Sequence, residues 1–240
     1  KCGGYIYTGE GQDLGQFWAE LNVGNAKVKK TTANEIVTNG NAMYSIAGAT
    51  FGIFSDQNCS NQIGTLTTNE NGDTNEVEVT AGTVYIKELS APKGYKLDTI
   101  VSSLKVEAGK TATLNVSDVP KVTETLVDLF KIDMETGKAT AQGNAALAGA
   151  EFTWHYYDGL YTKDNLPEKA TRTWVTKTVA EKDSNGTVHY VTKLVDAYKV
   201  SGDVFYTQNE KNVLPLGTLT VEETKAPDGY LLDGAYMQAG

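Results

Sequence analysis

The chain has 240 residues and a formal net charge of −9, with 21% charged and 40% hydrophobic residues. These proportions are typical of a folded globular protein rather than of a disordered one. The acidic balance disfavours binding to nucleic acid, and no apolar run of the sequence reaches the ~20 residues of a membrane span. The two cysteines and two histidines show no metal-binding spacing, so we expect no cofactor.

The first 25 residues match no other part of the chain. They contain Cys2, which either forms a disulfide with Cys59 in an oxidising environment or stays reduced. Cys2 and Gln16 also suggest an internal thioester, but the residues that flank them do not support this assignment. A surface cysteine or a Cys2–Cys59 disulfide is the better interpretation.

The remaining sequence favours strands over helices. It is rich in Thr and Val, whose β-branched side chains fit a pleated sheet better than a helix. Residues 75–80 and 111–116 alternate polar and apolar side chains, as half-buried strands do. Asn-Gly pairs at 71–72 and 185–186 predict tight turns. We therefore predict an all-β fold in which helices are short or absent.

An internal repeat organises this part of the chain. Each copy has alternate apolar residues that lead to a lysine, then Gly-Ala-x-Phe, and then Glu-x-x-Ala-Pro-x-Gly-Tyr. These anchors occupy residues 30, 48–51 and 88–95 in the first copy, and residues 131, 149–152 and 223–230 in the second. The same number of residues separates the lysine from Gly-Ala-x-Phe in both copies. The chain therefore holds two copies of one domain.

The lysine and the glutamate of each copy are predicted on inward-facing strand positions. Burial favours the neutral, nucleophilic amine of a lysine and the neutral acid form of a carboxyl. Together with an Asp or Asn, such a pair can form an amide bond within the protein, with loss of water or ammonia. Asp118 shares the parity of the apolar residues in the strand at 111–116, whereas Asn115 has the opposite parity. The alternative interpretation is that the lysines extend to solvent.

These anchors resemble the Cna B-type domain, also called the SpaA-type pilin domain, of Gram-positive bacterial surface proteins and pili. The resemblance implies two tandem immunoglobulin-like β-sandwiches. It also implies an isopeptide bond between Lys30 and Asp118, formed autocatalytically with Glu88 as the proton shuttle. Asn115 is the rival acyl partner. Lys131 and Glu223 are the corresponding candidates in the second copy, for which we predict no acyl partner within these residues.

The predicted organisation is an N-terminal segment of unassigned type at 1–25, a first domain at 26–120 and a second domain at 121–240. The stretch from Gly149 to Glu223 is nearly twice as long as its counterpart, which indicates an insertion over about 154–212. The aromatic residues of this insertion either pack against one another or form a ligand surface. By the repeat offset, the last strand of the second domain is expected to be missing from this sequence.

The function that the resemblance favours is that of a structural stalk or shaft module at the bacterial cell surface, in the cell wall or a pilus. Its expected partners are other pilin or surface-protein subunits. The alternative is an adhesin that binds a host ligand through the aromatic insertion or the N-terminal segment. In either case the only expected chemistry is a single self-crosslinking event, so we do not expect an enzyme that turns over.

Overall fold

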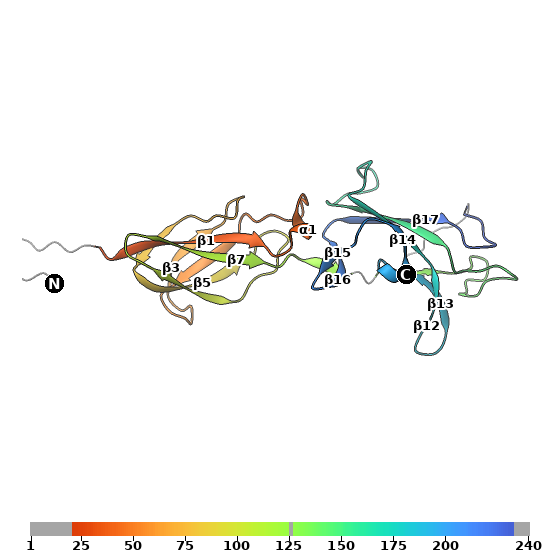
Figure 1. Ribbon diagram of the computed structural model, residues 1–240, viewed down its shortest axis with the longest axis horizontal. Helices are drawn as coiled ribbons and strands as arrows, with labels where there is room; N and C mark the ends of the chain where they lie inside the picture. Colours follow the sequence, from red (N-terminus) through yellow and green to blue (C-terminus); the bar gives the residue numbers. More distant parts are fainter. Residues whose placement is uncertain (1–20, 125–126, 233–240) are drawn as a thin grey trace, which may run out of the picture.

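The computed structural model describes residues 21–124 and 127–232 (Figure 1). Two groups of strands follow one another along the long axis of the molecule. The described helices are the short α1 (Glu35–Thr38) and the 3₁₀ turn η1 (Asp196–Tyr198). None of the helices in these ranges is long and apolar enough to span a membrane. The all-β prediction is confirmed.

The first domain consists of two sheets that enclose a hydrophobic core. One sheet has the order β4-β1-β7 and the other the order β3-β2-β5-β6. Their strands are β1 (Val23–Thr32), β2 (Thr50–Phe54), β3 (Gln62–Thr67), β4 (Val77–Thr80), β5 (Gly82–Ser90), β6 (Val101–Val106) and β7 (Thr111–Asp118). β1 and β7 pair in parallel, so the first and last strands of the domain lie side by side. The strands predicted at 75–80 and 111–116 are thus found as β4 and β7.

The alternation of side chains along β1 and β7 follows the prediction. Ala26 and Val28 of β1 are buried in the core, and Lys30 continues the same buried row. In β7 the half-buried Val116 precedes the buried Asp118, and Asn115 is exposed. Because successive side chains of a strand point to opposite faces, Lys30 and Asp118 face the interior.

The second domain has a more elaborate arrangement. Its sheets have the orders β12-β13-β9 and β14-β11-β10-β17, and a third sheet has the order β15-β16-β8. The strands are β8 (Val122–Glu124), β9 (Leu129–Lys131), β10 (Glu151–Tyr157), β11 (Arg172–Lys177), β12 (Val179–Lys182), β13 (Val188–Thr192), β14 (Lys199–Gly202), β15 (Tyr206–Gln208), β16 (Lys211–Pro215) and β17 (Thr218–Lys225). β13 pairs antiparallel with β9, as β4 does with β1.

The repeat extends to details of the backbone. The Phe51–Glu88 pair of β2 and β5 corresponds to the Phe152–Glu223 pair of β10 and β17, and each pairing has an irregularity just before the phenylalanine. In both copies the glycine of Gly-Ala-x-Phe has positive φ (+85° at Gly48 and +86° at Gly149). A left-handed backbone of this kind favours glycine. The prediction of two copies of one fold is confirmed.

Much of the extra length of the second domain lies in one place. In the first domain a single residue separates β4 from β5, whereas residues 193–217 separate β13 from β17. We call residues 193–216 the brace segment. It contains η1, β14, β15 and β16.

The aromatic residues of the second domain lie mainly in its core. Trp154 and Trp174 are fully buried, as is Tyr156, and Phe205 of the brace segment stacks on Trp174 with ring centroids 5.5 Å apart. This arrangement supports the interpretation that these aromatic residues pack against one another. It leaves these large side chains unavailable to a ligand.

Two sequence predictions concern parts of the chain outside this description. Cys2 and the rest of the segment at 1–20 lie outside the described residues, so the Cys2–Cys59 disulfide remains a prediction. Cys59 itself is half-buried in the loop between β2 and β3. In the described ranges no strand follows β17, and none pairs with β9 in parallel as β7 pairs with β1.

Candidate functional site

Three ionisable side chains meet in the core of the first domain. Lys30 Nζ lies 2.6 Å from Glu88 Oε1 and 2.5 Å from Asp118 Oδ1. All three side chains are only 1% exposed. Burying three ionisable groups is costly unless they neutralise one another, so their proximity within the core is a specific arrangement.

Three strands bring these groups together. Lys30 comes from β1, Asp118 from the parallel neighbour β7, and Glu88 from β5 of the opposite sheet. In the ladder, Thr32 is directly opposite Asp118 and Lys30 is opposite Val116. The lysine side chain therefore reaches diagonally forward along the parallel pair to the carboxyl group.

Glu88 is held by contacts at both oxygens. Its Oε1 accepts a hydrogen bond from Lys30, and its Oε2 accepts one of 2.7 Å from the backbone N–H of Asp98. The Lys30 ammonium also lies 4.9 Å from the centre of the Phe51 ring, within cation–π range. Glu88 is thus fixed beside the amine, where a general acid–base would have to lie.

Asp118 differs from Glu88 in its hydrogen bonding. Neither of its buried carboxyl oxygens has a hydrogen-bond partner in the described part of the chain, although Lys30 Nζ is close. Burial is the main cause that raises the pKa of Asp118 to about 6, the Lys30 contact opposes the rise, and Glu88 adds to it. A carboxyl that is easily protonated is a better acyl donor than a carboxylate, because its hydroxyl can leave as water.

The arrangement can therefore support amide formation. The amine nitrogen of Lys30 would attack the carboxyl carbon of Asp118, one water would leave, and Glu88 would carry protons between the two groups. Asn115, the rival acyl partner, is exposed on the other face of β7.

The second domain has a similar but more open pair. Lys131 Nζ lies 2.6 Å from Glu223 Oε2, and the two side chains are 17% and 8% exposed. The other oxygen, Glu223 Oε1, is buried and has no hydrogen-bond partner in the described ranges. The structure brings together Lys131 and Glu223, the two candidates predicted for this domain, and the described residues place no third carboxyl beside them.

Some supporting residues were not identified from the sequence. In the first domain the hydroxyl of Thr68 accepts a hydrogen bond from Ala49 N and donates one to Ile46 O. These two bonds hold the Gly-Ala-x-Phe turn. Thr178 makes the equivalent bonds to Ala150 N and Leu147 O. The two threonines lie at different distances from their turns along the chain, so the repeat did not reveal them.

The fold and this buried set place the chain in a known class of domain. The family model for the SpaA prealbumin-like fold domain matches residues 24–120 and 132–239. The chain belongs to this family and contains two of its domains.

Individual relatives include surface proteins of Gram-positive bacteria. The trypsin-resistant surface T6 protein of Streptococcus pyogenes serotype M6 is 35% identical over an alignment of 88 residues, which covers 33% of this chain and 16% of that protein. The solved structure of the Bacillus anthracis TIE protein is 26% identical with a TM-score of 0.53, over 88% of this chain and 29% of that chain. A C-terminal fragment of the pilus adhesin SpaC from Lactobacillus rhamnosus GG is 19% identical with a TM-score of 0.42, over 86% of this chain and 78% of that chain. This chain thus spans only a minor part of the T6 and TIE proteins.

Proposed function

We propose that the chain is a structural stalk or shaft module of a Gram-positive surface protein or pilus, located outside the cell and joined to other subunits. In this proposal the first domain is closed by an amide bond between Lys30 Nζ and Asp118 Cγ, which forms once with Glu88 as the catalyst. The observation that carries the proposal is the buried contact of Lys30 Nζ with both Asp118 and Glu88, at 2.5 and 2.6 Å.

A link at this position suits a module that bears tension. β1 and β7 are the first and last strands of the domain and run parallel to each other. A pull on the two ends of the domain would pass from β1 through the link to β7. The other strands would then be bypassed, and the sandwich could not be unravelled by extension.

The experiment is an intact-mass measurement, at isotopic precision, on the denatured and reduced protein. The expected mass is that of the sequence minus one water, and the deficit should vanish in Lys30→Ala. Lys29→Ala is the matched control, because Lys29 lies on the same strand with its amine on the surface, bonded to Asp73. It should keep the deficit.

Two further variants test the roles of the carboxyl groups. Asp118→Asn should change the loss from water to ammonia, because the nitrogen of the side-chain amide then leaves in place of the carboxyl oxygen. Glu88→Gln should leave a folded protein without the deficit, because the proton shuttle is absent. A wild-type mass equal to that of the sequence would overturn the proposed link and leave a buried ion-paired cluster.

A further inference from the structure

The two domains are joined by residues 119–124, which we call the connection. It is hydrogen-bonded on both of its sides. Lys96 N donates to Val119 O, and Lys121 N donates to Gly94 O, so the Ala-Pro-x-Gly-Tyr turn of the first domain holds the start of the connection. β8, the next part of the connection, pairs antiparallel with β16 of the brace segment. A connection held in this way differs from an exposed, flexible linker.

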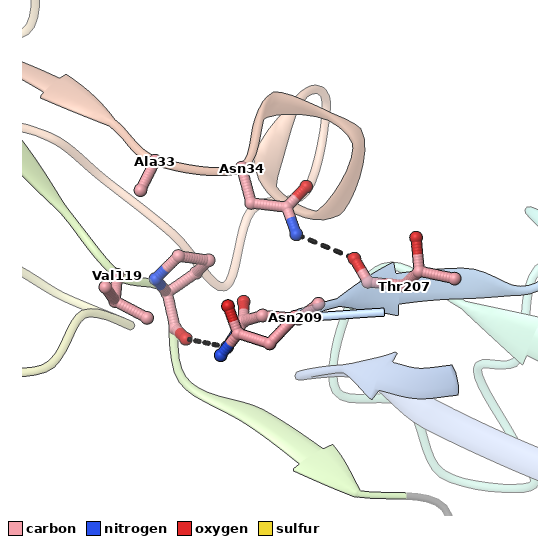
Figure 2. Close-up of a pocket in the computed structure, with 7 residues that line it drawn as sticks. Ala33, Asn34, Val119, Thr207 and Asn209 are labelled. Carbon is pink, nitrogen blue, oxygen red and sulfur yellow. Dashed lines mark hydrogen bonds between the residues drawn. The ribbon is translucent and has the colours of Figure 1, made fainter. Parts of the chain in front are cut away.

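The brace segment also contacts the first domain directly. Asn34 Nδ2, just before α1, donates a 2.8 Å hydrogen bond to Thr207 O, and Gln208 Nε2 donates one of 3.4 Å to Pro120 O (Figure 2). Both acceptors and donors line one small crevice between α1, the connection and β15. The tip of the β15–β16 hairpin is therefore bonded to two separate parts of the first domain's end.

A deeper layer of contacts lies at the end of the brace segment. The hydroxyl of Tyr44 donates to Lys121 O at 2.6 Å and accepts from Leu216 N at 2.8 Å. Asn41 Nδ2 donates to Leu216 O at 3.0 Å and to the Tyr156 hydroxyl at 2.9 Å. Tyr44 thus connects the first domain, the connection and the brace segment through one oxygen atom.

Apolar packing is continuous across the same joint. Val37, Tyr44 and Tyr95 of the first domain belong to the hydrophobic cluster that forms the core of the second domain. That cluster includes residues of the brace segment, namely Leu194, Phe205, Tyr206, Val213 and Leu214. An interface that shares a core with one of its domains resists relative motion more than a polar interdomain contact does.

We propose that the brace segment, residues 193–216, locks the two domains into one rigid unit. The first domain has no counterpart of this segment, because only one residue separates β4 from β5 there. The extra residues of the second domain thus act at the junction, where they convert two tandem domains into a single rod. This inference is independent of the amide bond, since none of the contacts involves Lys30, Glu88 or Asp118.

The test is the rotational tumbling of each domain, measured by ¹⁵N NMR relaxation on the full chain. The wild-type domains should share one correlation time. In the double variant Asn34→Ala/Tyr44→Phe the shared value should be lost, and each domain should tumble faster. Both substitutions lie in the first domain, so the core of the second domain keeps all its own residues. Adding Thr123→Pro, on the exposed face of β8, removes a backbone donor from the β8–β16 ladder and should enlarge the effect.

The control is Asn58→Ala/Tyr85→Phe, which makes the same chemical changes away from the junction and should tumble as the wild type does. Different correlation times for the two wild-type domains would overturn the inference. It would also be overturned if both the double and the triple variants, shown to be folded by their amide spectra, tumbled as the control does.

Discussion

The two domains place the same lysine and glutamate on equivalent strands but surround them differently. In the first domain the side chains of Lys30 and Glu88 are 1% exposed, whereas those of Lys131 and Glu223 are 17% and 8% exposed. The difference coincides with β7, which covers the lysine-bearing edge of β1 and supplies Asp118. No described strand lies in that position beside β9. The neighbouring parallel strand, more than the lysine strand itself, therefore accounts for the burial of the lysine and supplies the third ionisable group.

The largest expected effect is that of Lys30→Ala. By analogy with a disulfide, a covalent link that closes a loop approaching 100 residues stabilises a domain by about 4–5 kcal/mol. The variant also restores the carboxyl group of Asp118 and leaves it buried with Glu88 and no amine between them, which adds to the loss. We expect the free energy of unfolding of the first domain, measured with urea, to fall by about 4 kcal/mol or more. Lys29→Ala should change it by less than about 1 kcal/mol, as surface ion pairs do. Equal losses of unfolding free energy in Lys30→Ala and Lys29→Ala would contradict the proposed role of Lys30.

Lys131→Ala should have a smaller effect. It removes an ion pair that is partly accessible to water and leaves Glu223 without a partner, which we expect to cost about 1–3 kcal/mol. Lys131 should also remain a free amine in these 240 residues, whereas the amine of Lys30 should be consumed. Reductive methylation of the denatured protein, followed by peptide mapping, distinguishes the two lysines. Methylation of Lys30, or protection of Lys131, would contradict the proposed difference.

Much of this site could be predicted from the sequence because strands impose a strict alternation. Val28 and Lys30 share a face, as do Val116 and Asp118, so parity alone placed Asp118 inside and Asn115 outside. The repeat then supplied Glu88 as an anchor shared by both copies.

The junction between the domains could not be predicted in this way. Asn41 and Leu216 are bonded although they lie far apart in the sequence, and neither belongs to a repeated pattern. The same is true of the backbone N–H of Asp98, which orients Glu88 but carries no side-chain signal. Contacts of this kind depend on how loops pack in three dimensions, whereas strand periodicity reports only local geometry.

The third prediction concerns pH and uses the unlinked variant Glu88→Gln. Burial, the main cause that raises the pKa of Asp118 above its ordinary value of 3.8, persists in this variant although the smaller contribution of Glu88 is removed. The folded state therefore binds a proton more tightly than the unfolded state. The stability that this proton provides is present at low pH and is lost as the pH rises through the raised pKa of the folded state. The melting temperature of Glu88→Gln should therefore rise as the pH falls from 7 to 5. The double variant Glu88→Gln/Asp118→Asn lacks the titrating carboxyl and serves as the control. Identical pH profiles for the two variants would show that Asp118 does not titrate in this range.

The smallest effect is expected for Asn115→Ala, which tests the choice between the two candidate acyl partners. Asn115 is exposed, so its replacement should alter the free energy of unfolding by no more than about 0.5 kcal/mol. The mass deficit of one water should persist, because the proposed bond uses the inward-facing Asp118. If Asn115 were the partner, the wild type would lack one ammonia instead, and this variant would recover the full mass of its sequence. The two outcomes differ in the leaving group and in whether the deficit survives the substitution, so one spectrum of each protein identifies the strand face that carries the proposed bond.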